Sequence, residues 1–175
     1  MTIPSSREKA KESDSSILII GVGNPILKDD GVGIHVLKML EKKYSGIPDL
    51  HFMELSTGGL SLAERFIGYD KVILIDALAL ENGTPGKVHK LSMDDFHSTI
   101  HQYCAHDCNL PTAYNLLEQQ LGSENLPQDV IIIGIEAEKL DEFGETLSES
   151  VKGAIPKALA IIEQELRDVL KNEKC

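Results

Sequence analysis

Short runs of aliphatic residues recur along the chain, and they are separated by longer stretches in which apolar residues have a helical spacing. Residues 17–20, 71–76 and 129–135 are almost wholly aliphatic, which indicates strands that are buried on both faces of a sheet. Residues 51–55 read as a further strand, and residues 87–91 show the alternation of apolar and polar positions that is typical of a sheet edge. The pattern therefore predicts about five strands.

The stretches between these runs have apolar residues at the spacing that is typical of helices. Apolar residues recur every three or four positions in residues 31–44, 60–67, 111–121 and 148–169. Strands that alternate with helices favour a mostly parallel sheet with helices on both faces. The expected fold class is therefore α/β, a three-layer α/β/α sandwich with a twisted, mostly parallel sheet of about five strands.

The first residues of the chain follow neither pattern. Residues 1–16 are rich in Ser, Lys and Glu, and we expect them to form a disordered polar N-terminal extension to a single α/β domain at residues 17–171. The extension lacks the apolar core of a secretory signal, and no apolar run approaches the roughly 20 residues of a membrane helix. We expect a cytoplasmic protein without a membrane span.

The charge of the chain limits its possible partners, and its cysteine content indicates the redox state of its thiols. The chain carries 28 acidic and 17 basic residues, with a formal net charge of −11, which argues against a nucleic-acid partner. Three cysteines, an odd number in a chain without an export signal, fit reduced thiols better than a disulfide framework.

Residues that follow a parallel strand are the natural candidates for a site, because such sheets bind ligands beyond their carboxyl ends. The segment Gly21 to Gly33 joins a strand to a helix, as a dinucleotide-binding turn does. It departs from G-x-G-x-x-G, however, and Asp29 and Asp30 stand where a pyrophosphate would need positive potential. Either aspartate is also typical of a helix cap, and one can cap while its neighbour faces a cleft.

Asp76 follows four aliphatic residues, where a carboxylate is costly to bury without a partner, although a cap or turn contact is an alternative role. His106 lies in the polar stretch 92–110, which we expect to be a loop with a short helix inside. An oxygen, oxygen and nitrogen ligand set from three separate strand ends would suit nickel or zinc and leave positions open for water or substrate.

Two other chemistries compete with this set. Cys104, His106 and Cys108, with His97 or His101 nearby, could form a zinc site, but their spacing is tighter than in structural zinc modules and no second cysteine pair follows. A serine hydrolase is disfavoured, because no serine lies in a G-x-S-x-G elbow.

Six features of the chain, taken in order, resemble the hydrogenase maturation endopeptidases that process the large subunit of nickel-iron hydrogenases. The resemblance extends from Ile17 to about Leu170. The features are the Gly21-Val22-Gly23-Asn24 turn with the Asp29-Asp30-Gly31-Val32-Gly33 helix start, Thr57-Gly58-Gly59, Ile75-Asp76-Ala77, Pro85-Gly86, His106-x-x-x-Leu110 and Gly134-Ile135-Glu136.

The resemblance implies that Asp30, Asp76 and His106 are the catalytic and metal-contacting residues. It implies an endopeptidase that removes the C-terminal extension of a hydrogenase large-subunit precursor after nickel insertion. The nickel would come with the precursor, although zinc or cadmium could occupy the site in vitro. The metal would either activate the scissile bond or serve recognition alone.

We also expect a monomer. The thiols of Cys104 and Cys108 stand beside His106 in the sequence, and they depart from a ligand set made of oxygen and nitrogen alone. The alternative function, from a different class, is a non-catalytic nickel- or zinc-binding escort of the precursor.

Overall fold

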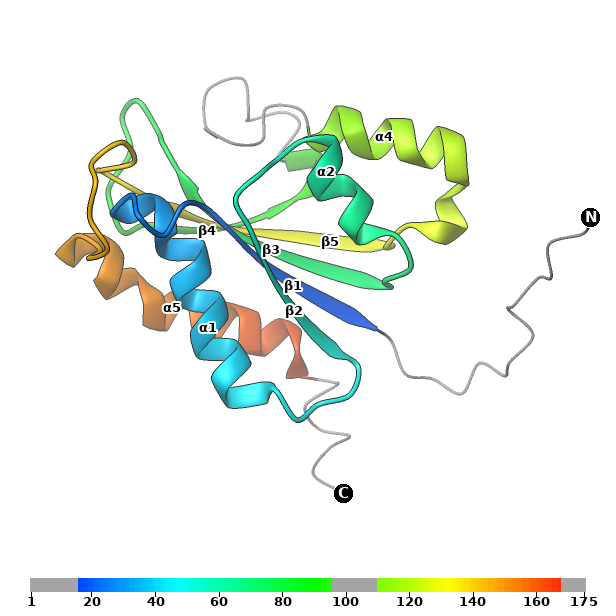
Figure 1. Cartoon of the computed structure of the whole chain (residues 1–175), viewed down its shortest axis with the longest axis horizontal. Helices are drawn as coiled ribbons and strands as arrows, with labels where there is room; N and C mark the ends of the chain where they lie inside the picture. The colour runs from blue at the N-terminus through cyan, green and yellow to red at the C-terminus, as the bar shows by residue number, and fades with distance from the viewer. Residues whose placement is uncertain (1–15, 96–109, 168–175) are drawn as a thin grey trace, which may run out of the picture.

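A single five-stranded sheet forms the centre of the molecule, in the order β2-β1-β3-β5-β4 (Figure 1). The structure, a computed structural model, describes residues 16–95 and 110–167. Four strands run parallel, and β4 pairs antiparallel with β5 at one edge, as the alternation of residues 87–91 predicts. The strands are β1 (Ile17–Val22), β2 (Leu50–Leu55), β3 (Lys71–Leu78), β4 (Val88–Ser92) and β5 (Asp129–Glu136).

Helices cover both faces of this sheet. The helices α1 (Val32–Tyr44) and α5 (Glu149–Glu165) pack on one face, and the helices α2 (Leu60–Ala63) and α4 (Leu110–Leu121) lie together on the other (Figure 1). The expected α/β/α sandwich with a mostly parallel sheet is confirmed. No helix in the described part of the chain is long and apolar enough to cross a membrane.

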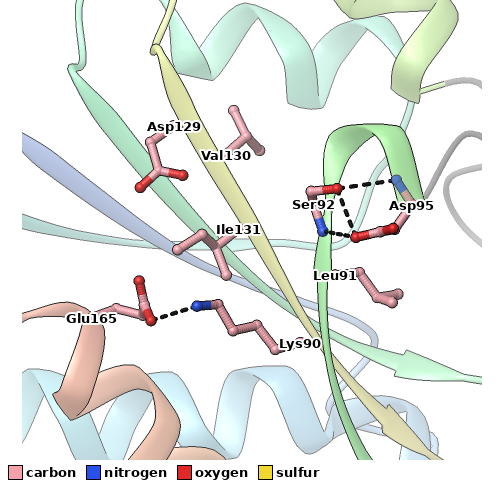
Figure 2. A pocket seen from close by; sticks show the side chains of 8 residues that line it. All are labelled: Lys90, Leu91, Ser92, Asp95, Asp129, Val130, Ile131 and Glu165. Atoms are coloured by element: carbon pink, nitrogen blue, oxygen red, sulfur yellow. Dashed lines mark hydrogen bonds and ion pairs between the residues drawn. The ribbon is translucent and has the colours of Figure 1, made fainter.

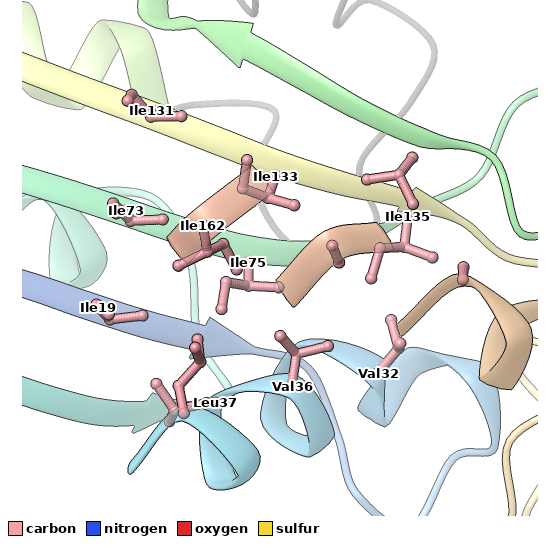
Figure 3. Close-up of a cluster of buried hydrophobic side chains, with 14 of the residues drawn as sticks. Ile19, Val32, Val36, Leu37, Ile73, Ile75, Ile131, Ile133, Ile135 and Ile162 are labelled. Atoms are coloured by element: carbon pink, nitrogen blue, oxygen red, sulfur yellow. The ribbon is translucent and has the colours of Figure 1, made fainter. Parts of the chain in front are cut away.

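Successive side chains of each buried strand enter opposite cores. Ile19, Ile73 and Ile133 face α1 and α5, as Figure 3 shows, whereas Leu18 and Leu74 face α2 and α4. All five of these side chains are fully buried, and each such burial contributes about 1.5–3 kcal/mol. This two-sided burial is why the strands read as continuous aliphatic runs.

The strand β3 continues for two residues beyond Asp76, so the expectation that Asp76 ends its strand is wrong. Pairing with β1 stops at Gly21 opposite Ile75, whereas pairing with β5 continues through Asp76, Ala77 and Leu78. Beyond Ile75, β3 therefore pairs with β5 and no longer with β1. On the side of β1, Asp76 is the first residue past the paired region.

Two helical segments differ from their expected form. The helix expected at residues 60–67 is a single turn of α-helix followed by the 3-10 turn η2 (Glu64–Phe66), since about two turns are too short for cooperative α-helix formation. In the stretch 92–110, residues 93–95 are helical, and 96–109 lie outside the described residues. Ser92 and Asp95 exchange side-chain to backbone hydrogen bonds in the manner of a capping box (Figure 2).

The amino ends of β3 and β5 carry a network of ion pairs. Lys71 lies 2.8 Å from Asp129 and 3.1 Å from Glu165, and Lys90 lies 2.6 Å from Glu165. Figure 2 shows three of these four residues around a cavity of about 370 Å³. This cavity lies at the amino end of β5, whereas Asp76 lies near the carboxyl end of β3. The cavity is therefore separate from the candidate site.

Candidate functional site at the carboxyl edge of the sheet

The chain leaves β1 at Val22, passes through the 3-10 turn η1 (Asp29–Gly31) and enters α1, so that η1 contacts β3. Gly33 makes this close approach possible. A Cβ atom at Gly33 would lie 2.3 Å from the carbonyl oxygen of Ile75 and 2.4 Å from that of Val22. Only a residue without a side chain lets the start of α1 lie against the two strands, and this packing brings the Asp30 turn to the edge that carries Asp76.

The turn that follows β1, which contains Gly23 and Asn24, packs against Asp30. Gly23 has φ 137°, and a Cβ atom there would lie 1.9 Å from the carbonyl oxygen of Asp30. The backbone N–H of Asn24 donates to Oδ2 of Asp30 at 2.7 Å, and the N–H of Leu27 donates to the carbonyl of Asn24 at 3.0 Å. These backbone donors are engaged within the turn and with a carboxylate, which is the opposite of a turn that receives a phosphate.

Asp30 and Asp76 are both buried, with exposed fractions of 2% and 1%. Asp30 accepts the hydrogen bond of Asn24, and Oδ1 of Asp76 accepts the backbone N–H of Ala77 at 2.8 Å. Burying carboxylates is costly, and a nearby cation offsets part of that cost. Two carboxylates at one edge of the sheet are therefore suited to contact with a divalent cation.

The histidine expected to join them, His106, lies outside the described residues, as do Cys104 and Cys108 of the alternative zinc site. Leu110, four positions after His106, is fully buried in the cluster that faces α2 and α4. Leu74 and Leu78 belong to the same cluster, and Asp76 shares their face by strand alternation. Within residues 16–95 and 110–167, no group of three or more His, Cys, Asp and Glu side chains could hold a metal ion.

The neighbouring aspartate, Asp29, has a different environment. Its carboxylate is fully buried, and Oδ1 accepts the backbone N–H of Ser148 at 2.7 Å. Oδ2 accepts the hydroxyl of Ser148 at 2.9 Å and the backbone N–H groups of Lys139 at 3.1 Å and Glu138 at 3.3 Å. A carboxylate offers about four lone-pair positions, so four donors leave Asp29 little capacity for a further ligand.

Neither aspartate caps the helix that follows, so that part of the capping interpretation is wrong. The residue at the start of α1 is Gly31, and no side-chain hydrogen bond caps it. Asp29 instead reaches Ser148, the residue that precedes α5. The 3-10 turn places the aspartates before the helix, where contacts with other segments take the place of local capping.

Sequence reasoning missed the role of Glu136 at the end of β5. Its carboxylate is 2% exposed, with Oε1 2.5 Å from Nε2 of His89 and Oε2 accepting the backbone N–H of Thr84. Its carbonyl accepts the N–H of Gly86 at 2.8 Å, so Glu136 holds the turn that joins β3 to β4. The signal was present, because Glu136 follows an aliphatic run just as Asp76 does.

A cavity of about 530 Å³ lies just beyond the ends of β3 and β5. Residues 79–81 form one wall and residues 137–141 most of the other. Leu80 and Leu140 contribute apolar surface, whereas Glu81, Glu138 and Asp141 contribute carboxylates. A cavity of this size can admit side chains of a bound peptide.

Comparison with known proteins agrees with this architecture. A sequence model described as hydrogenase maturation protease matches residues 34–165. A protein described as the delta subunit of coenzyme F420 hydrogenase, from Methanothermobacter thermautotrophicus, is 30% identical over 168 residues, which cover 87% of this chain and 96% of that protein. The hydrogenase 2 maturation protease of Escherichia coli K12 is 26% identical, with 88% of each chain covered.

A solved structure has the same fold. The hydrogenase maturating endopeptidase HybD of Escherichia coli superposes with a TM-score of 0.71 and 23% sequence identity, covering 87% of this chain and 93% of that one. At this identity the likeness bears on the fold alone.

Proposed function

The chain belongs to the hydrogenase maturation protease family, and we propose that it removes the C-terminal extension of a nickel-containing hydrogenase large-subunit precursor after nickel has been inserted. The family defines it as a maturation endopeptidase. The proposal adds the nickel requirement and the residues that sense the metal.

The observation that carries this proposal is the pair of buried carboxylates at one edge of the sheet. Asp30 comes from the turn after β1 and Asp76 from β3, and the contact of η1 with β3 joins the two elements. Two carboxylates can balance the charge of a divalent ion, and oxygen ligands are compatible with nickel. In this proposal, Asp30 and Asp76 contact the nickel that the precursor carries, and His106 is the third contact.

The nickel belongs to the substrate, where a divalent ion can polarise a carbonyl as a Lewis acid. The part of this chain is to orient that centre. Asn24 holds one oxygen of Asp30 through its N–H, and Ala77 holds one oxygen of Asp76 in the same way. Each aspartate therefore has one oxygen fixed by the backbone, which restricts the directions from which it can contact the precursor.

The test is cleavage of a large-subunit precursor from the same cell, prepared with and without nickel and followed by intact mass. Wild type should release a C-terminal peptide from the nickel-loaded precursor only. Asp30→Asn and Asp76→Asn keep the side-chain shape and remove the charge, and each should slow cleavage by about 100-fold or more. Glu41→Ala, an exposed residue in the last turn of α1, is the matched control and should cleave like wild type.

Equal cleavage of the loaded and nickel-free precursors would refute nickel sensing. Wild-type rates in both Asn variants would refute the assignment of the two carboxylates. A different result would favour the escort function, namely an unchanged precursor mass together with micromolar nickel binding by the isolated chain in isothermal titration.

A further inference from the structure

The segment that precedes Asp30 is joined to a distant part of the chain by its backbone. The N–H of Lys28 donates to the carbonyl of Glu142 at 3.1 Å, and the N–H of Asp29 donates to that of Lys139 at 3.2 Å. The N–H of Gly144 donates back to Ile26 at 2.9 Å. Residues 26–29 and 139–144 therefore form a seam, defined by these hydrogen bonds, along one side of the Asp30 turn.

The carboxylate of Asp29 ties this seam to α5. Its four donors are the backbone N–H groups of Glu138, Lys139 and Ser148 and the hydroxyl of Ser148. Ser148 is the N-terminal cap residue of a 17-residue helix whose buried side chains pack on the sheet. The turn that carries Asp30 is thus fastened to a rigid element through Asp29.

Asp29 and Asp30 are adjacent in one 3-10 turn, so a rotation of that turn would move both. The N–H of Gly31 donates to the carbonyls of Leu27 and Lys28, which makes the turn a compact unit. Four hydrogen bonds at Asp29 oppose such a rotation from outside the turn. They also occupy the carboxylate of Asp29, whereas the neighbouring carboxylate of Asp30 accepts the N–H of Asn24.

We propose that Asp29 is a positioning residue, which holds the carboxylate of Asp30 in the orientation needed to contact the precursor's nickel. This inference rests on the proposed function. Misplacement of a reacting or contacting group by about 1 Å can lower a rate by about 100-fold, so the effect of losing Asp29 should appear in turnover.

The experiment compares Asp29→Asn, Ser148→Ala and Ser150→Ala with wild type in cleavage of the nickel-loaded precursor. An amide in place of the carboxylate directs an NH2 group toward N–H donors, so Asp29→Asn should lower kcat by about 10–100-fold with KM within about threefold of wild type. Ser148→Ala removes one of the four donors and should give a smaller loss of kcat. Ser150→Ala leaves all four bonds to Asp29 intact and should behave as wild type.

A second measurement needs no substrate. The N–H of Asn24 donates to Asp30, so its hydrogen exchange followed by NMR reports the position of that carboxylate. Asp29→Asn should speed exchange at Asn24 and leave the N–H of Ile19, in the interior strand β1, protected. If Asp29→Asn does not fold, Ser148→Ala serves for both measurements.

The outcomes separate the two proposals. A variant that melts earlier but keeps the wild-type kcat and the protection of Asn24 would show that Asp29 is only structural, and would overturn the inference. A wild-type protein that leaves the nickel-loaded precursor uncut would overturn the proposed function, while the exchange at Asn24 would still decide whether Asp29 positions Asp30.

Discussion

Gly33→Ala should separate the elements that carry Asp30 and Asp76. The new Cβ atom would lie 2.3 Å from the carbonyl oxygen of Ile75 and 2.4 Å from that of Val22. Both oxygens belong to strands held in the sheet, so they cannot yield as a flexible side chain would. The start of α1 must move away instead, and it takes η1 and Asp30 with it.

The size of this movement follows from the contact distance. A carbon and a carbonyl oxygen approach to about 3.3 Å, so a contact of 2.3 Å requires a displacement of about 1 Å. Overpacking of this kind costs about 1–3 kcal/mol, and the better helix propensity of Ala returns up to about 1 kcal/mol. We expect a net loss of about 1–2 kcal/mol in the free energy of unfolding, and about 100-fold slower cleavage of the nickel-loaded precursor.

Urea unfolding and the cleavage assay test both parts. Gly153→Ala is the matched control, because Gly153 is an exposed helical glycine whose added Cβ would meet no atom within 4 Å. That variant should be more stable than wild type by about 0.5–1 kcal/mol and cleave at the wild-type rate. Gly33→Ala with wild-type stability and activity would refute the packing argument.

Three other substitutions test the core and the two networks of buried or partly buried charge. Ile162→Ala, at a fully buried position of α5, should lower the free energy of unfolding in urea by about 2–5 kcal/mol, and a loss below about 1 kcal/mol would contradict its place in the core. Glu136→Gln should cost about 1–3 kcal/mol, because Thr84 and His89 lose their carboxylate, whereas the exposed control Glu138→Gln should change stability by less than about 0.5 kcal/mol. Burial acts to raise the pKa of Glu165, but hydrogen bonds from Lys90 and Lys71 outweigh it and lower that pKa below its ordinary value of 4.5. A lowered carboxyl pKa stabilises the fold above the ordinary value, and this contribution is lost as the pH falls through the folded-state pKa. Glu165→Gln should therefore lose about 1 kcal/mol at neutral pH and show a flatter decline in acid, and an unchanged acid limb in urea titrations across pH would contradict this.

The sheet and most of its helices could be predicted from local pattern. Parallel strands buried on both faces need aliphatic residues at nearly every position. Strands can therefore be predicted at residues 17–20, 71–76 and 129–135 from the local sequence alone. The edge position of β4 follows from its alternation in the same way. Asp30 and Asp76 could be assigned to one edge because the carboxyl ends of parallel strands meet there.

Long-range contacts decided the rest. Asp29 and Asp30 are chemically identical neighbours, and what distinguishes them is Ser148, which lies 119 positions beyond Asp29 in the chain. The end of β3 depends on β5, which continues the pairing after β1 has left the sheet. Glu136 likewise acquires its role from His89, 47 positions earlier. A local pattern records which face of an element is buried, but hydrogen-bond partners are set by segments that meet only when the chain has folded.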